Sequence, residues 1–186
     1  NYLLSILRLN EQGVRVTLTQ LAEHLKGLPQ AEGIGTTLPT VGGMIRRMAR
    51  EGLVETTTKK DVMLTKKGAP YARSIVRRHR LAERLVVDVL GIDLQNAHEE
   101  AHRLEHAMTP TVVQKLAEFL GKPEFCPHGT PMPGTTLPEN TITLMETEPG
   151  MIVEVAMIGE SLEDSVDLMK ILQEHSIMPG NRHKVI

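Results

Sequence analysis

Four of the chain's eight histidines lie at positions 79, 98, 102 and 106, and their spacing constrains the fold more than any other feature. An α-helix turns by about 100° per residue, so residues three and four positions apart share a face. Two such faces are present: His98, His102, Glu105 and His106 on a helix expected over residues 96–108, and His79 and Glu83 on the helix before it. Imidazole and carboxylate groups are good ligands for divalent first-row metals. Two facing helices with these side chains pointing inward are one way to build a metal site.

Two other interpretations of this segment remain open. Glu99, Glu100 and Arg103 lie among the histidines, so the helix could be a solvated polar surface. The run from His102 to His106 also matches the His-x-x-Glu-His pattern of zinc peptidases, in which the histidines bind zinc and the glutamate is the general base. Five residues are a short signal, and a peptidase needs a third ligand and a substrate cleft. A zinc hydrolase therefore stays the alternative of a different class, and we expect no enzyme and no catalytic residue.

Composition limits the kind of core and the kind of partner. Hydrophobic residues make up 40% of the 186 residues and aromatics only 2%, so the core must be aliphatic. The net charge of −2 means that any DNA-binding surface must be a local basic patch. The single cysteine, Cys126, excludes an internal disulfide, which fits the reducing cytoplasm in which we expect the protein to act. No apolar run approaches the roughly 20 residues of a membrane span, so we expect no membrane partner.

The N-terminal third predicts a winged helix-turn-helix. Helical apolar spacing is present over residues 2–9, 20–25 and 37–51, and two short β-like runs follow at 53–57 and 62–65. Three helices followed by a hairpin is the order of that motif. Residues 27–36 break the periodicity and form a longer connection than helix pairs usually have.

The third helix has the composition of a recognition helix. Small residues begin it and can enter the major groove, arginines follow at positions suited to phosphates, and two lysines lie at the expected tip of the wing. The candidate DNA contacts are Thr37, Leu38, Pro39, Thr40, Gly43, Arg46, Arg47, Arg50, Lys59 and Lys60. A single module of this size usually needs a dimer for specificity, and the helices between residues 69 and 120 are the expected dimerisation unit. A winged helix used only for protein contacts, or a metal-independent regulator, remains possible at this point.

The remaining sequence predicts a helical region and a small β-rich domain. Helices are expected over residues 65–91, 96–108 and 110–120, then a Pro-rich linker, then strands at 141–145, 151–158 and 185–186 with a helix at 165–174. The predicted fold is mainly α with small β. Its domains are a winged helix-turn-helix at 1–65, a helical dimerisation and metal-binding domain at 66–126, a linker at 127–140 and a C-terminal β domain at 141–186. The chain begins inside an apolar helix and ends on an apolar strand, so we expect residues to be missing at both ends.

The helical block resembles one known family. The residues that carry the resemblance are Arg78-His79-Arg80-Leu81-Ala82-Glu83-Arg84-Leu85, Ala97-His98-Glu99-Glu100-Ala101 and Leu104-Glu105-His106. They resemble the iron- and manganese-dependent repressors of the diphtheria toxin repressor and manganese transport regulator family. Pro131-Met132-Pro133-Gly134 and Met178-Pro179-Gly180 match the family's linker and a turn in its SH3-like (FeoA-like) third domain, here apparently truncated. The resemblance implies a cytoplasmic homodimer that binds a palindromic double-stranded DNA operator and represses metal-uptake genes when metal is bound.

The resemblance also implies two metal sites. An ancillary site would use His79, Glu83 and His98, with Asp164 and Asp167 from the third domain. A primary site would use Asn1, His102, Glu105 and His106, and would be the switch because it reaches the first helix. This chain has His102 where relatives often have Cys or a carboxylate, and Asn1, which offers only a neutral carbonyl oxygen, where they have Met or Asp.

Ligand chemistry suggests the metal. The expected ligands are nitrogen and oxygen atoms with no thiolate, and carboxylate, carbonyl and water suit Mn(II), while imidazole also suits Fe(II) and Zn(II). Mn(II) is therefore the expected cofactor and Fe(II) the second, with Zn(II), Co(II) or Cd(II) as substitutes.

Overall fold

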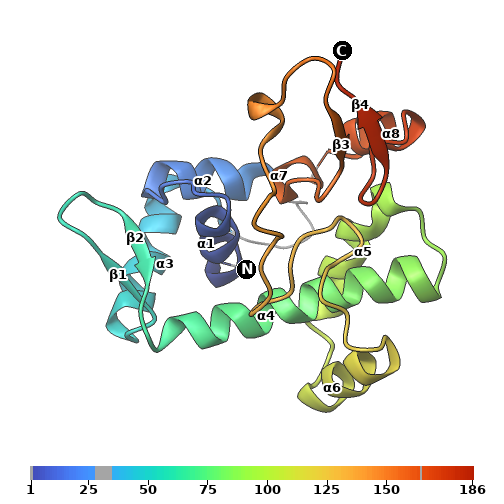
Figure 1. The fold of residues 1–186 in the computed structure, drawn as a ribbon. Coiled ribbons are helices and arrows are strands. Elements are labelled where there is room, and N and C mark those ends of the chain that lie inside the picture. Colours follow the sequence, from blue (N-terminus) through green and yellow to red (C-terminus); the bar gives the residue numbers. More distant parts are fainter. Residues whose placement is uncertain (1, 28–34, 164) are drawn as a thin grey trace. The chain divides into compact units, whose positions relative to one another are not determined.

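The computed structural model describes residues 2–27, 35–163 and 165–186. The chain divides into two compact units, residues 1–77 and 78–186, and the division falls inside helix α4 (Gly68–Arg84). Figure 1 shows the helices and two small two-stranded sheets, β1–β2 and β3–β4. The molecule is mainly helical with small sheets, as the sequence predicts. Each unit is described by itself.

The first unit contains three helices and a hairpin, in the order predicted from the sequence. The elements are α1 (Tyr2–Glu11), α2 (Leu18–Gly27), α3 (Leu38–Arg50), β1 (Val54–Thr56) and β2 (Val62–Leu64). The strands are antiparallel, with Val54 opposite Leu64. The backbone N–H of Val62 also donates to the carbonyl of Val16, so the β-like step before α2 lies against the hairpin.

Capping residues in the sequence begin helix α3, and an aliphatic core holds it in place. Thr37 caps its N-terminus by accepting a hydrogen bond from the Thr40 N–H, and a proline occupies its first turn. Its apolar residues Val41 and Ile45 recur at helical spacing and are buried with Leu21 and Leu25 of α2. Burial of that stripe leaves the opposite face of α3 in solvent.

The helical part of the second unit is closely packed. Helix α4 continues into a π-helical segment (Leu85–Val89) and ends at Gly91, whose φ of 68° permits the reversal. α5 (Leu94–Glu105) and α6 (Pro110–Phe119) follow. Ala82, Ala97 and Ala101 are fully buried. Ala82 of α4 and Ala101 of α5 belong to one buried apolar cluster.

The last part of the second unit differs from the sequence prediction. β3 (Ile152–Glu154) and β4 (Arg182–Lys184) pair antiparallel, and α7 (Glu160–Glu163) and α8 (Val166–Glu174) lie between them in sequence. The strand expected at 141–145 is wrong, because Thr143 and Glu146 form a capping box around a 3₁₀ turn (Leu144–Glu146). The strands expected at 151–158 and 185–186 are displaced or shortened, and α7 was not expected. Among the described residues, no helix is long and apolar enough to span a membrane.

Candidate metal centre

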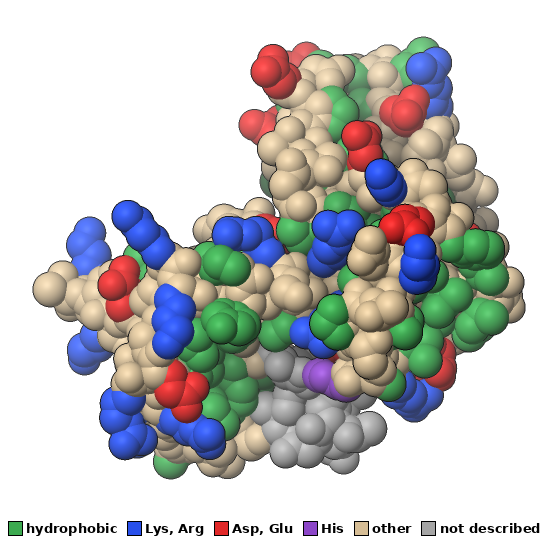
Figure 2. All heavy atoms as spheres, turned by 90° about the horizontal axis from the view of Figure 1, so that it is seen from below, with side chains coloured by type: hydrophobic (Ala, Val, Ile, Leu, Met, Phe, Trp, Pro, Cys, Tyr) green, Lys and Arg blue, Asp and Glu red, His purple; other side chains and the backbone are tan. Residues whose placement is uncertain are grey.

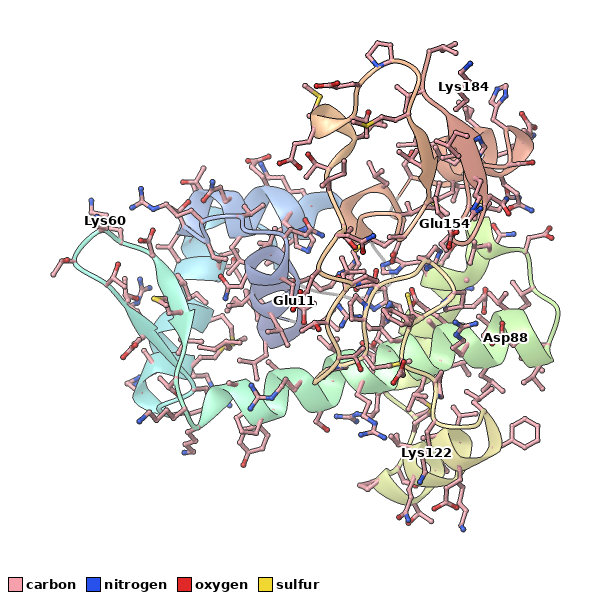
Figure 3. All side chains as sticks on the ribbon, viewed as in Figure 1. Glu11, Lys60, Asp88, Lys122, Glu154 and Lys184 are labelled. Atoms are coloured by element: carbon pink, nitrogen blue, oxygen red, sulfur yellow. The ribbon has the colours of Figure 1, made fainter. Side chains whose placement is uncertain are left out.

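A cluster of buried imidazole and carboxylate groups lies inside the second unit. His79 and Glu83 come from α4, and His98, His102 and Glu105 from α5. Each is 4% exposed or less. Figure 3 shows side-chain nitrogen and oxygen atoms gathered where α4, α5 and α7 come together. Helical spacing turns the side chains on α4 and those on α5 toward one another, as the sequence predicts.

His79 is the centre of the contacts between α4 and α5. Its Nδ1 lies 2.8 Å from Glu105 Oε2, and its Nε2 lies 3.1 Å from both Glu83 Oε1 and His98 Nδ1. The rings of His79, His98 and His102 have centroids 4.6–4.7 Å apart. One side chain therefore connects the residues that the sequence assigns to two separate metal sites, and the structure brings them into one continuous cluster.

Three further residues complete the cluster on the α7 side. Glu163 of α7 and His128 are almost fully buried, as is Cys126. His98 Nδ1 lies 3.3 Å from Glu83 Oε1 and from Glu163 Oε2, and His128 Nδ1 lies 3.5 Å from an oxygen of each glutamate. An ion with bonds of about 2.1 Å holds neighbouring ligand atoms about 3.0 Å apart in an octahedron and about 3.4 Å apart in a tetrahedron. The observed spacings fit around such an ion.

The structure places the remaining predicted ligands elsewhere. Asp167 is exposed in the first turn of α8, so it is not brought to the cluster, whereas Glu163 is. The side chain of His106 is 57% exposed, and its Nε2 lies 3.3 Å from Glu105 Oε1. Asn1 and Asp164 lie outside the described residues.

Sequence reasoning missed Cys126, His128 and Glu163. A signal for the first two was present, because a cysteine and a histidine two positions apart are both metal-ligating types. Glu163 forms a pair with Glu160, three positions before it. The pair predicted as ligands, Asp164 and Asp167, has the same spacing and lies four residues further along the chain. Sequence spacing alone does not distinguish the two pairs.

Electrostatics favour the charged forms of Glu83, His79 and His128 despite their burial. Burial by itself would raise the pKa of Glu83, but His79 and His128 hold that pKa well below its usual value. Burial would lower the pKa of both His79 and His128. The carboxylates of Glu83 and Glu105 nevertheless raise the pKa of His79, and those of Glu163 and Glu83 raise the pKa of His128. The pKa of the Cys126 thiol is raised well above its usual value by burial and by nearby Glu83 and Glu163.

The cluster also fits a bound cation. Glu83 Oε2, Glu105 Oε1 and both ring nitrogens of His128 are buried without a hydrogen-bond partner among the described residues. Buried polar atoms in proteins almost always have partners, because leaving them without one costs free energy. A divalent cation would satisfy several of these atoms at once, and imidazole and carboxylate are suitable donors.

Two arginines of α4 hold the loop that presents Cys126 and His128. Arg84 donates to the carbonyls of Phe125 and Cys126, and Arg80 donates to the carbonyl of Pro131. Arg80 also donates twice to Glu160 of α7, with both side chains buried. The planar guanidinium group suits such multiple fixed contacts. Arg80 therefore fixes the helix that carries Glu163 as well as the loop that carries His128.

The candidate DNA contacts lie on the surface of the first unit. Thr37, Leu38, Pro39, Thr40, Arg46, Arg47, Arg50, Lys59 and Lys60 are all exposed, and Gly43 is half-buried. Figure 3 labels Lys60 at the tip of the β1–β2 hairpin. Lys and Arg side chains (blue) outnumber acidic ones on the part of Figure 2 that belongs to this unit. A local basic patch is what the net charge of the chain requires of a DNA-binding surface.

Comparisons with known proteins identify the family. A family model described as "Iron dependent repressor, metal binding and dimerisation domain" matches residues 65–134. The iron-dependent repressor IdeR of Mycobacterium leprae is 33% identical over 193 residues, which cover 97% of this chain and 80% of that protein. The chain belongs to this repressor family. The diphtheria toxin repressor of Corynebacterium efficiens, 30% identical over 195 residues, matches 100% of the chain and 81% of that protein.

A solved structure shows the same fold. A structure titled "Manganese-dependent transcriptional repressor complex with manganese" is 28% identical, with a TM-score of 0.80, and the match covers 97% of this chain and 79% of that one. The chain is therefore a metal-dependent transcriptional repressor and not an enzyme, and its family dimerises and binds DNA. The geometry agrees, since His102 is buried while His106, the other histidine of the peptidase-like motif, is mostly exposed.

Replacing Arg80 should weaken metal binding without removing any of the ligands proposed here. In Arg80→Met the hydrogen bonds to Pro131 and Glu160 are lost, so the loop and α7 are held less firmly. We expect Mn(II) affinity, measured by titration calorimetry, to fall about tenfold or more, as is typical when groups that orient metal ligands are removed. Hydrogen exchange of residues 156–163 in the metal-free protein should become faster.

The matched control is Arg103→Met. Arg103 also lies beside the cluster in sequence, but it is exposed and pairs only with Glu99 and Glu100 on its own helix. Arg103→Met should change Mn(II) affinity by no more than about twofold, because exposed ion pairs contribute little free energy. Equal losses in both variants would show that Arg80 does not position the site.

Metal binding should release protons. A histidine whose pKa is raised keeps its proton until the pH rises through that higher value, and a metal binds only the neutral imidazole. Mn(II) affinity should therefore increase with pH above about 6.5, the ordinary histidine value. The buffer takes up the released protons. Calorimetric titrations with Mn(II) in two buffers of different ionisation enthalpy should therefore give different heats of binding. His128→Gln should reduce that difference, whereas His183→Gln, in the half-buried middle position of β4, should not. Equal heats in both buffers would contradict the assignment.

Proposed function

We propose that the protein is a Mn(II)-responsive repressor whose metal is bound by the buried cluster of the second unit. The observation that supports this is the set of buried carboxylate and imidazole atoms that have no hydrogen-bond partner, namely Glu83 Oε2, Glu105 Oε1 and the His128 nitrogens. A site rich in carboxylates suits Mn(II), and three glutamates, Glu83, Glu105 and Glu163, contribute to the cluster.

The state of Cys126 supports the same choice. Its pKa is raised, so in the metal-free protein it is a neutral thiol, which is a weak ligand compared with a thiolate. The donors of the cluster are then mainly oxygen and nitrogen. Fe(II) is the alternative, because imidazole and carboxylate also suit Fe(II) and the matched relatives IdeR are named as iron-dependent.

His102 and Glu105 are proposed to have a second role. Together with His106 and Asn1 they would form the switch site, in which the metal joins the second unit to the first helix. Glu105 would then serve both parts of the cluster, because one of its oxygens holds His79 and the other approaches His102 and His106.

The proposed mechanism is thermodynamic linkage. The proposed DNA contacts are on α3 and the wing, and α4 begins in the same unit and carries His79 and Glu83 further along. When the metal is bound, its ligands hold α4, α5 and α7 together, which favours one arrangement of the two recognition helices in the homodimer. That arrangement matches a palindromic operator. Metal and operator must then each raise the affinity of the protein for the other by the same factor. The proposed targets are metal-uptake genes.

The test is operator binding with and without metal. A duplex can be selected from a random library with the Mn(II)-loaded protein and then titrated with metal-free and Mn(II)-loaded protein in a gel-shift assay. We expect binding at least tenfold tighter with Mn(II), and Glu83→Gln should remove most of that increase because Glu83 contacts His79, His98 and His128. Glu100→Gln, on the exposed side of α5, is the control. Equal affinity with and without Mn(II) would refute the proposal, and a response to Fe(II) alone under anaerobic conditions would favour the alternative.

A separate variant tests the DNA surface. Arg47→Ala removes an exposed guanidinium from α3 that pairs only with Glu51 in the described structure. If Arg47 contacts phosphate, binding should weaken at every Mn(II) concentration and the slope of log K against log salt should decrease by about one. Mn(II) affinity measured without DNA should stay unchanged. An unaltered salt slope would place Arg47 outside the interface.

A further inference from the structure

The tip of the β1–β2 hairpin is closed by hydrogen bonds within its own turn. The Thr57 N–H donates to the carbonyl of Asp61, and the N–H groups of Lys60 and Asp61 donate to the carbonyl and the hydroxyl of Thr57. Lys60 has a φ of 63°, in the left-handed region that residues with a side chain adopt at a cost. Such a conformation persists where surrounding contacts hold it in place.

Arg15 supplies such contacts from the segment before α2. Its guanidinium donates through Nε to the carboxylate of Asp61 and through Nη2 to the carbonyl of Lys59, which is 2.6 Å away. One side chain therefore holds two points of a turn that lies 44 and 46 residues further along the chain. A planar guanidinium with donors in a fixed arrangement suits this double contact better than the compact ammonium of a lysine.

The backbone of Arg15 is itself fixed. The next residue, Val16, is buried in the core of the first unit, and its carbonyl accepts a hydrogen bond of 2.7 Å from the N–H of Val62 at the start of β2. Val62 is buried in the same core. Arg15 therefore extends to the tip of the hairpin from a segment that is held against β2.

These contacts leave the two lysines of the tip free to meet a partner. Lys59 uses only its backbone carbonyl toward Arg15, and the side chains of Lys59 and Lys60 are exposed and make no ion pair with the described acidic residues. The acidic side chain of the turn, Asp61, is paired with Arg15 instead. The tip therefore presents two cations on a backbone that is already ordered.

We propose that Arg15 is the positioning residue of the wing, which holds the tip in the conformation that presents Lys59 and Lys60 to the phosphate backbone of the operator. A loop that is ordered before binding loses less conformational freedom when it meets its partner. The inference rests on the proposed function in one respect, since it takes both lysines as DNA contacts. Because an exposed ion pair contributes little to the free energy of unfolding, the role concerns DNA binding and not the stability of the fold.

The variant that tests this most sharply is Asp61→Asn, in the full chain with saturating Mn(II) and the selected operator duplex. Removal of a negative charge beside DNA should by itself tighten binding. If Arg15 holds the wing through Asp61, binding should instead weaken by about threefold or more, because the tip must then be ordered on binding. The matched control is Glu55→Gln, since Glu55 is exposed on β1 and makes no ion pair with the described residues. Glu55→Gln should bind the operator as tightly as the parent or more tightly.

Variants of Arg15 separate positioning from direct contact with DNA. Arg15→Met should weaken operator binding about as much as Asp61→Asn, and the double variant should be little weaker than either, because both changes remove one interaction. Arg15→Lys keeps the charge but cannot hold both points of the turn, so it should not restore the affinity of the parent. If Arg15 contacted DNA directly, Arg15→Met would weaken binding while Asp61→Asn strengthened it, and that result would overturn the proposal.

Hydrogen exchange gives a readout without DNA. Amide exchange of residues 57–61 should become about threefold faster or more in Arg15→Met and in Asp61→Asn, and should not change in Glu55→Gln. The midpoint of thermal unfolding should stay close to that of the parent in all three variants. Unchanged exchange in Arg15→Met, or operator binding by Asp61→Asn as tight as that of the parent, would overturn the proposal.

The result is separable from the metal response. Every variant is compared with the parent at the same Mn(II) concentration, and the exchange measurement needs neither operator nor metal. Equal affinity of the parent for the operator with and without Mn(II) would refute the proposed response to metal, and the comparison among the wing variants would still hold.

Discussion

Burial of Glu83 is the constraint on which the second unit depends. Its side chain is 1% exposed, and a carboxylate taken out of water is costly unless opposite charges or hydrogen bonds surround it. His79, His98 and His128 surround it from α4, α5 and the loop before Pro131. Each of these contacts requires a different segment to be in place, so the segments are coupled through one carboxylate. A cation that binds there would strengthen the coupling, which is how a small ion can act on a whole domain.

The cluster is held more firmly on one side than on the other. On the α7 side, Arg80 and Arg84 bind the loop carbonyls, Gly129 has a φ of 85°, and a Cβ there would lie 2.2 Å from the carbonyl oxygen of Ala156. The loop is therefore tied to the chain just before α7, and the Ile158 N–H also donates to the His128 carbonyl. On the other side, His106 is exposed and makes one contact with Glu105. The α7 side of the cluster is therefore held more rigidly than the His106 side. This difference suits a protein in which one metal site stabilises the fold and the other responds to metal.

Much of this could be predicted from the sequence, because helical periodicity is a local property. The facing histidines of α4 and α5, the three helices before the hairpin and the exposed face of α3 all follow from residues three and four apart. Glu163 could not be distinguished from Asp167, because both lie in pairs of acidic residues with the same spacing and only the end of α7 at Glu163 decides between them. The 3₁₀ turn at 144–146 was missed for a related reason, since Ile142 and Leu144 alternate with threonines as in a strand but both remain exposed.

The merging of two expected sites into one cluster has a physical cause. A residue pattern assigns ligands to helices, but the distance between the helices decides whether two sets of ligands stay apart. His79 of α4 contacts Glu105 of α5 as well as Glu83 of its own helix. At that separation one histidine serves both sets, and an ion bound by one set changes the ligands that remain for the other.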